Sequence, residues 1–269
     1  MNSKIAIEAR ELSFGYENGL VLTNVSFSIG AGELVALIGP NGSGKTTLLK
    51  LLLGFLPPKT GQVSLCDQPL QSYAPIERAK TIAYVSQQPW LSFPLTAFEL
   101  ASLGRYPHAS RFKFSSADAA AVERALDETG SKHLGERSFA TLSGGEKQKV
   151  LISRALAQSA RILLLDEPTL HLDLYYQLQI LAALKKLCVE QRVTVIAVLH
   201  DVNQVLLFAD KALLLNDGML RAFGPVVEVI NENSIRDLLG VDMKAIEDAE
   251  TGGRYYLPRD PFRIRRQPS

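Results

Sequence analysis

The feature that most constrains this chain is the eight-residue segment GPNGSGKT at residues 39–46. It matches the pattern G-x-x-x-x-G-K-[ST]. The apolar run Glu33–Gly39 that leads into it predicts a strand buried on both faces, and Thr46–Phe55 after it predicts a helix. Glycines in such a turn let backbone N–H groups face inward around phosphate oxygens, and the helix N-terminus adds a favourable dipole. The segment therefore predicts a phosphate-binding loop.

Two side chains of this loop have specific expected roles. Lys45 can reach the β- and γ-phosphates of a nucleotide, and the hydroxyl of Thr46 can ligate Mg²⁺. A glycine-rich turn that binds no nucleotide is the alternative, and the presence of both side chains disfavours it. The predicted nucleotide-binding residues here are Gly39, Pro40, Asn41, Gly42, Ser43, Gly44, Lys45, Thr46 and Thr47.

Two adjacent carboxylates, Asp166 and Glu167, follow the predicted buried strand Ile162–Leu165. Ligand sites of parallel α/β sheets lie at the carboxyl ends of the strands. Asp166 suits Mg²⁺, and Glu167 suits the positioning and polarisation of an attacking water. Solvated acids after a core strand are the alternative, which the phosphate loop disfavours.

Other polar residues also occupy strand or helix ends. His200 follows the predicted strand Val193–Leu199, and Gln87 follows Thr81–Ser86, although each is a weak signal alone. Ser143 and Glu146 form a predicted capping box that starts the helix Glu146–Ala157. Two glycines, Gly144 and Gly145, lie inside that box, and we interpret them as allowing close approach of the backbone to an anion.

The rest of the pattern predicts an α/β organisation with a helical insert at about residues 89–158. Capping boxes are predicted at Thr96–Glu99 and Ser115–Asp118 within that insert. A βαβ unit and then a hairpin follow it. Beyond Asp242 the pattern fades, and we expect residues 242–269 to form a partly disordered tail. The expected strands and helices are Ile5–Phe14, Val25–Ile29, Gln62–Leu65, Ala117–Thr129, Tyr175–Gln191, Lys211–Leu215 and Met219–Phe223.

The composition argues against several classes of protein. Among 269 residues, 29 Lys and Arg balance 28 Asp and Glu, so the near-neutral charge argues against a nucleic-acid-binding surface. Cys66 and Cys188 lie far apart, which argues against a disulfide scaffold or a thiolate zinc site. No apolar stretch reaches the ~18 residues of a membrane-spanning helix, and the N-terminus does not resemble a signal peptide. We therefore expect a cytoplasmic chain.

Taken in order, these motifs resemble the ATP-binding cassette (ABC) ATPase family over Ile5 to Val241. The resemblance implies an α/β fold: a P-loop NTPase (RecA-like) core, an N-terminal antiparallel β-subdomain and an inserted α-helical subdomain. It implies a nucleotide-binding domain at residues 1–241 that takes ATP and Mg²⁺. It also implies that Tyr16 stacks on adenine.

The same resemblance implies roles at the γ-phosphate. Glu167, His200 and Gln87 would be catalytic residues, and Thr46, Gln87 and Asp166 would hold the metal. Gln87 would also touch the membrane partner. The residues that would complete the site across a dimer are Ser143, Gly144, Gly145 and Asp173.

A narrower resemblance is to the importer ATPases for iron–siderophore, haem, cobalamin and molybdate uptake, carried by Leu103–His108 and Val198–Asn203. Lys147 and Lys149, where Arg is common, and Leu170-His171 depart from it. It implies a head-to-tail homodimer on the cytoplasmic face of the inner membrane. Two integral-membrane permease subunits and, indirectly, a substrate-binding protein would be its partners, and we expect residues 89–110 to contact the permease.

Three alternatives stay open at this point. The chain could be a soluble ABC ATPase acting on nucleic acid or ribosomes, although it lacks a long coiled-coil insertion and a second cassette. It could serve an importer for another substrate, such as zinc or manganese. It could also be an assembly module that binds nucleotide without turnover, which Lys45, Asp166, Glu167 and His200 argue against.

Overall fold

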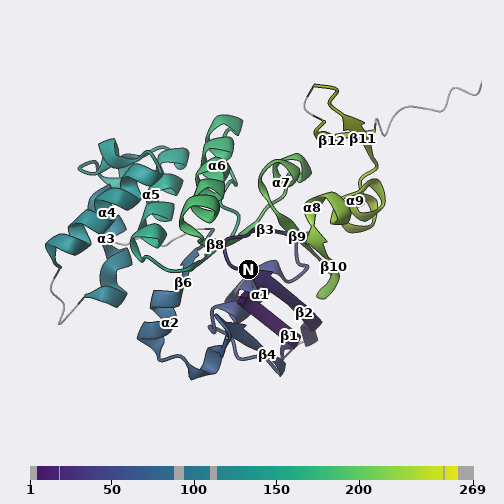
Figure 1. Ribbon diagram of the computed structural model, residues 1–269, viewed down its shortest axis with the longest axis horizontal. Helices are drawn as coiled ribbons and strands as arrows, with labels where there is room; N and C mark the ends of the chain where they lie inside the picture. Colours follow the sequence, from purple (N-terminus) through teal and green to yellow (C-terminus); the bar gives the residue numbers. More distant parts are fainter. Residues whose placement is uncertain (1–4, 18, 88–93, 110–113, 251, 260–269) are drawn as a thin grey trace, which may run out of the picture.

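A six-stranded sheet forms the centre of the computed structural model, which describes residues 5–17, 19–87, 94–109, 114–250 and 252–259. Its strand order is β10-β9-β3-β8-β7-β6 (Figure 1). All neighbouring pairs are parallel except β10, which pairs antiparallel with β9. The strands are β3 (Leu34–Ile38), β6 (Ile82–Val85), β7 (Ile162–Leu165), β8 (Thr194–Val198), β9 (Lys211–Asn216) and β10 (Met219–Pro225).

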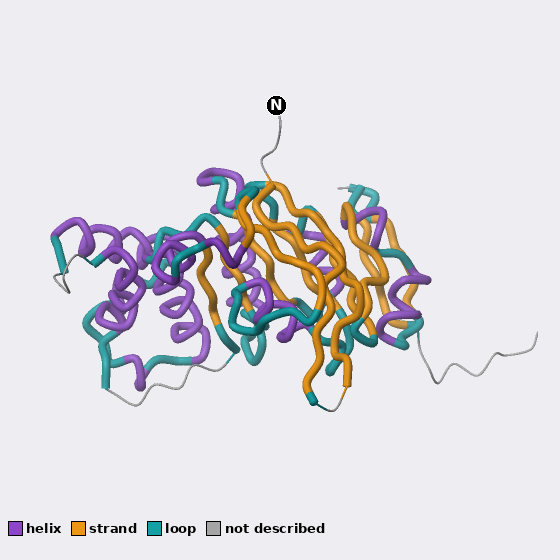
Figure 2. Tube along the Cα trace, turned by 90° about the horizontal axis from the view of Figure 1, so that it is seen from below, coloured by secondary structure: helices purple, strands orange, loops and turns teal. Residues whose placement is uncertain are grey.

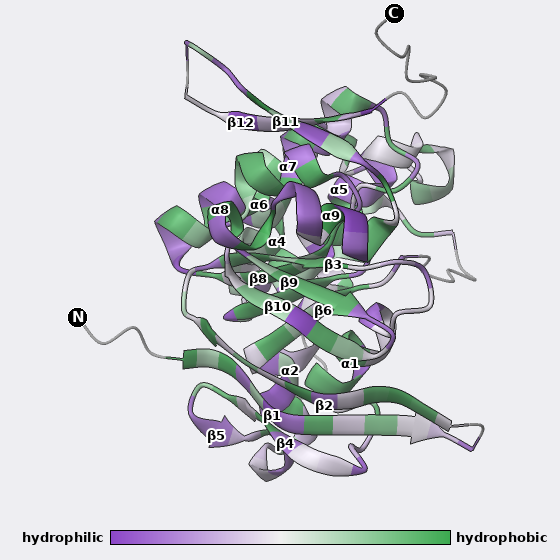
Figure 3. Cartoon of the chain, turned by 90° about the vertical axis from the view of Figure 1, so that its right-hand side faces the viewer, coloured by the Kyte–Doolittle hydropathy of each residue, from purple (hydrophilic) through white to green (hydrophobic). Residues whose placement is uncertain are grey.

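A second, antiparallel sheet has the order β2-β1-β4-β5. The predicted N-terminal strand pair is confirmed, and both strands extend further than the sequence pattern indicates. Figure 3 shows this sheet and the six-stranded sheet as separate layers with α1 between them. Leu48 and Leu49 of α1 share one hydrophobic core with Ile7 and Val35 of the two sheets. The elements are β1 (Ile5–Tyr16), β2 (Gly19–Gly30), β4 (Thr60–Leu65), β5 (Gln68–Pro69) and α1 (Lys45–Leu52).

Strand β3 shows why its sequence is apolar without alternation. Val35 and Leu37 join the core beneath α1, whereas Leu34 and Ala36 join a second core under the helices on the opposite face. Because both faces are covered, every residue of β3 is buried. The helices after β7 are α6 (Leu174–Gln191), α7 (Val202–Phe208), α8 (Val226–Val229) and α9 (Glu232–Leu239).

Helices gather at one end of the molecule, as Figure 2 shows. Here α3, α4 and α5 pack against one another, and all three predicted capping boxes form at their starts. In the described part of the chain, no helix has the length and apolarity needed to cross a membrane. The helical segments of this region and the preceding one are η1 (Leu70–Ser72), α2 (Pro75–Thr81), α3 (Ala97–Ser102), η2 (Leu103–His108), α4 (Ser116–Glu128), η3 (Lys132–Leu134), η4 (Phe139–Thr141) and α5 (Gly144–Ala157).

One ion pair ties the helical region together. Arg105 Nε lies 2.9 Å from Asp118 Oδ1, and Arg105 also donates to the Ala157 carbonyl at 2.7 Å. The side chain and backbone N–H of Ser115 donate to the other carboxylate oxygen. These Ser115 hydrogen bonds, and then the Arg105 pair, lower the pKa of Asp118 to about 2.

We expect this pair to make stability depend on pH. Because the folded-state pKa of Asp118 is lowered, its contribution is present above about pH 4 and is lost as the pH falls toward about 2. Asp118→Asn should therefore be less stable than the wild type at pH 6. Between pH 6 and pH 3 it should lose less stability than the wild type does. Urea midpoints at both values test this expectation, and an equal loss in both proteins would contradict it.

A short hairpin follows α9, where the sequence pattern indicates no strands. It pairs β11 (Met243–Glu247) with β12 (Arg254–Pro258) and lies at the top of Figure 3. Tyr256 of β12 is 1% exposed. The described part of residues 242–269 therefore contains a hairpin, which the sequence pattern did not predict.

Candidate active site

The loop at residues 39–46 joins β3 to α1, as the motif predicts. Gly44 has a φ of +102°, in the left-handed region that favours glycine. At Gly39, a Cβ atom would lie 2.1 Å from the carbonyl oxygen of Leu215. The two positions therefore need glycine for different reasons, namely backbone conformation and close packing against β9.

Lys45 and Ser43 give this loop its binding chemistry. Lys45 Nζ is buried and donates to the carbonyls of Gly39 at 2.8 Å and Pro40 at 2.9 Å. Burial lowers the pKa of Lys45, while Glu167 and Asp166 oppose that shift. Ser43 Oγ is buried and has no hydrogen-bond partner among the described residues. A cation and an unsatisfied hydroxyl in a glycine-rich loop fit a phosphate group.

Asp166 lies at the carboxyl end of β7 and is 5% exposed. Its carboxylate accepts hydrogen bonds from Thr46 and from Tyr84, the latter at 3.3 Å. Burial raises the pKa of Asp166, and those hydrogen bonds oppose the shift. No group of three His, Cys, Asp or Glu in the described ranges could hold a metal. A Mg²⁺ ion held by the oxygens of Thr46 and Asp166 would take its remaining ligands from phosphate and water.

Tyr84 is a site residue that the sequence analysis missed. It lies within β6, and the pairing of β6 with β7 brings it beside Asp166. Burial, followed by the neighbouring Asp166 charge, raises the pKa of the Tyr84 hydroxyl, which therefore stays a donor. No local pattern could have identified it, because strand order across the sheet creates the contact.

Gln87 and His200 both contact Glu167, so the three predicted catalytic residues lie together. Gln87 Nε2 donates to Glu167 Oε2 at 2.6 Å, and His200 Nε2 lies 2.9 Å from Glu167 Oε1. The three residues follow the neighbouring strands β6, β7 and β8, so the sheet edge assembles them. Glu167 has a φ of +55°, a costly conformation for a residue with a side chain. A carboxylate held in this way can orient and polarise a water.

The predicted cross-dimer residues lie at other helix starts. Ser143 and Gly144 are exposed at the start of α5, and Ser143 forms the capping box with Glu146. Asp173 Oδ1 accepts from the backbone N–H of Tyr176 at 3.0 Å and so caps α6. In the described structure, none of these residues hydrogen-bonds to the loop at 39–46.

Gly145 has a packing role in addition to its predicted one. We interpreted both glycines of this segment through close approach of an anion. A Cβ atom at Gly145 would lie 2.7 Å from the ring of Tyr176, so packing against α6 already explains that glycine. At Gly144, a Cβ atom would meet the neighbouring Leu172 side chain at an ordinary 3.7 Å. The need for glycine at Gly145 is therefore steric, and the anion contact of Ser143, Gly144 and Gly145 stays a prediction.

Tyr16 ends β1 with half of its surface exposed. Its ring packs edge-on against Phe14, with the centroids 5.0 Å apart. The exposed ring has the character expected of a surface that stacks on a planar base.

Residues 22–170 match the family model described as "ABC transporter". Together with the fold and the loop that carries Lys45, this match shows that the chain belongs to the ABC transporter family, as one of its ATPases. It binds ATP, hydrolyses it in a manner coupled to transport, and works with a permease as part of a cassette dimer.

Two similar proteins are named as ATP-binding proteins of hemin import and ferric enterobactin transport. The chain is 40% identical to the hemin import ATP-binding protein HmuV of Bradyrhizobium diazoefficiens over 261 residues, with 94% of each chain covered. It is 36% identical to the ferric enterobactin transport ATP-binding protein FepC of Escherichia coli over 253 residues, covering 94% of this chain and 93% of that protein.

Solved structures agree with the fold. A metal-chelate type ABC transporter in an inward-facing conformation has a TM-score of 0.84 and 32% identity, covering 96% of this chain and 98% of that one. A dimeric cassette, MJ0796, bound to ADP and Pi has a TM-score of 0.71 and 30% identity, covering 82% and 98%. The predicted P-loop NTPase core with an antiparallel β-subdomain and an inserted helical subdomain is thereby confirmed.

Proposed function

We propose that this chain is the ATP-hydrolysing subunit of an importer for haem or a ferric siderophore. The observation that carries the catalytic part is the meeting of Gln87, Glu167 and His200 next to the loop of Lys45. The names of the similar proteins support the cargo. In this proposal the permease and the binding protein recognise the iron chelate, and this chain supplies the energy of ATP hydrolysis.

Each residue of the ATP site has a separate role in this proposal. Lys45, Ser43 and the backbone of the loop bind the phosphates, and Tyr16 stacks on the base. Thr46, Asp166 and Gln87 would hold Mg²⁺, which neutralises charge on the phosphate oxygens when it is bound. Glu167 takes the proton of the attacking water, and His200 orients Glu167 and contacts the γ-phosphate.

The second phosphate-contacting surface serves a neighbouring subunit in this proposal. Ser143 and Gly144 are exposed and do not bond to the loop of their own chain. Asp173 is exposed at the start of α6. A head-to-tail homodimer would bring these residues to the nucleotide of the partner subunit.

We expect the dimer to depend on ATP. Glu167→Gln should be largely monomeric alone and dimeric at saturating Mg²⁺-ATP, because blocked hydrolysis preserves the nucleotide that joins the subunits. Light scattering measures the mass directly. Adding Ser143→Arg to this variant should prevent dimerisation, and a dimer that persists would contradict the placement of Ser143.

The membrane partners are part of the same proposal. The chain would lie on the cytoplasmic face of the inner membrane, bound to two permease subunits and served indirectly by a binding protein. Of the segment 89–110 expected to contact the permease, residues 89–93 lie outside the described residues, and so does Ser110. Leu103 is 52% exposed and Tyr106 is 64% exposed, which suits an interface.

The cargo can be tested by reconstitution with a candidate permease and its binding protein. Proteoliposomes with internal ATP should take up haem or a ferric hydroxamate siderophore, and Glu167→Gln should abolish that uptake. Uptake of zinc alone would contradict the cargo but not the ATPase. No stimulation of ATP hydrolysis by the permease would favour the soluble alternative.

A further inference from the structure

The C-terminal hairpin is fastened to α7, the helix that follows His200. Asn203, in the first turn of α7, donates from its side chain to the Tyr256 carbonyl at 3.1 Å and accepts from the Tyr256 N–H at 2.8 Å. One side-chain amide thus satisfies both backbone groups of a residue in β12, as a neighbouring strand would do. Removing it leaves two partly buried polar groups without their partner.

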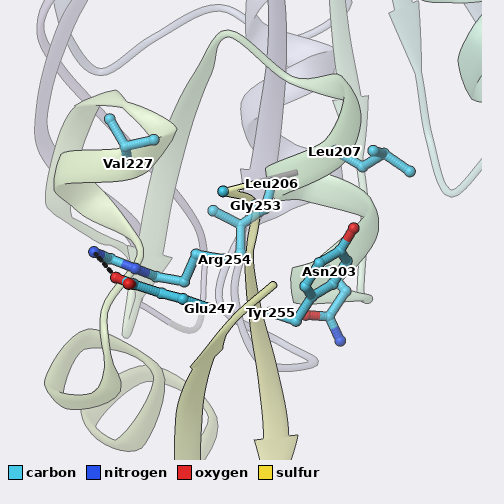
Figure 4. A pocket seen from close by; sticks show the side chains of 9 residues that line it. Asn203, Leu206, Leu207, Val227, Glu247, Gly253, Arg254 and Tyr255 are labelled. Atoms are coloured by element: carbon cyan, nitrogen blue, oxygen red, sulfur yellow. Dashed lines mark ion pairs between the residues drawn. The ribbon is translucent and has the colours of Figure 1, made fainter. Parts of the chain in front are cut away.

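One side of this attachment borders an open space. A cavity of about 310 Å³ lies between the hairpin, α7 and α8, with Asn203 on its wall (Figure 4). Leu207 and Val227 border it and are 58% and 67% exposed. The ion pair drawn there, Glu247 with Arg254 at 3.7 Å, joins the two hairpin strands to each other. The two side-chain hydrogen bonds of Asn203 thus join hairpin and helix beside this open space, while the buried Tyr256 belongs to the core that also contains Val202 and Val205 of α7.

The hairpin has separate anchors elsewhere. The hydroxyl of Tyr256 donates to the carbonyl of Ile230, between α8 and α9, at 3.0 Å. Glu232 of α9 accepts from the backbone N–H of Ala245 at 2.8 Å. These contacts hold the hairpin to the body of the protein without touching α7, so the two attachments can be separated by substitution.

The first turn of α7 is hydrogen-bonded to two other parts of the protein. Asp201 caps it by accepting from the N–H groups of Asn203 and Gln204. The side chain of Gln204 donates to Gln177 of α6, and Gln177 donates to the carbonyl of Leu172 at 2.8 Å. That carbonyl belongs to the loop between Glu167 and Asp173. The same turn therefore touches the hairpin on one side and the loop after the carboxylates on the other.

His200 needs such support. Its side chain is 44% exposed, so packing does not fix it. The backbone before it is held where Leu199 N–H donates to Leu37 at 3.2 Å, and the backbone after it is held by the first turn of α7. We propose that Asn203 is a positioning residue that holds His200 against Glu167 through the C-terminal hairpin. This inference rests on the proposed roles of His200 and Glu167.

The test compares Asn203→Ala with two matched variants, Tyr256→Phe and Glu232→Ala. Asn203→Ala should lower the kcat of ATP hydrolysis about tenfold while KM for ATP stays within about twofold, because the loop at 39–46 supplies the ground-state contacts. Tyr256→Phe and Glu232→Ala each remove one of the two anchors to the body and leave the other, so the hairpin stays in place. Both bonds of Asn203 then remain, and kcat should stay near the wild-type value. The unfolding temperature of each variant is measured alongside.

Two results would overturn the proposal. One is an unchanged kcat in Asn203→Ala. The other is a loss of kcat in all three variants that follows their loss of stability, which would make Asn203 a structural residue. Failure of the proposed function looks different, because the wild type would then lack Mg²⁺-dependent hydrolysis that Glu167→Gln removes.

Discussion

Glu167→Gln should bind ATP with near wild-type affinity and hydrolyse it about 10²- to 10⁴-fold more slowly, the usual contribution of a positioned general base. Glu167 acts on the attacking water, so its contribution appears in the transition state and hardly in the ground state. The amide keeps the shape of the side chain and one oxygen that can face Gln87 or His200. What it loses is the ability to accept a proton.

Asp166→Asn is the matched comparison for that variant. Asp166 bonds to Thr46 and would act through Mg²⁺, so its loss should weaken Mg²⁺-dependent ATP binding as well as turnover. Binding is measured by calorimetry with and without Mg²⁺, and turnover by phosphate release. If Glu167→Gln retained the wild-type rate, the assignment of the base would be wrong, and His200 would be the next candidate.

Lys45→Ala should bind ATP about 10- to 100-fold more weakly, the effect of removing one charge-assisted contact to phosphate. The ammonium also bonds the carbonyls of Gly39 and Pro40, so the loop itself loses two internal contacts. Lys50→Ala on the same helix is the control, since Lys50 follows the loop and is only partly buried. Equal affinities in Lys45→Ala and the wild type would remove Lys45 from the site.

The predictable part of this molecule is the part that local patterns encode. The unbroken apolar runs of β3 and β7 indicate strands covered on both faces, and a strand–loop–helix motif fixes the position of Lys45. Ser115 and Asp118 specify a helix start through their spacing alone. Polar residues that directly follow parallel strands meet at one sheet edge, so Gln87, Glu167 and His200 could be placed together in advance.

The unpredicted part depends on contacts between distant segments. Tyr84 reaches Asp166 because β6 pairs with β7, and Asn203 reaches Tyr256 because the hairpin folds back on α7. Neither sequence neighbourhood carries a signal of its partner. Gly145 is a similar case, since the Tyr176 ring of α6 explains why this position needs glycine and the local sequence does not show that contact.

The central claim is that two subunits complete each ATPase site, and mixing two inactive variants tests it most directly. Lys45→Ala disables the phosphate loop, and Ser143→Arg disables the surface offered to the partner. A mixed dimer places both changes in one site and leaves the other site intact. An equal mixture should therefore hydrolyse ATP although neither variant does so alone, because only the mixed dimer contains one intact site of two. A mixture no more active than either variant alone would contradict the claim.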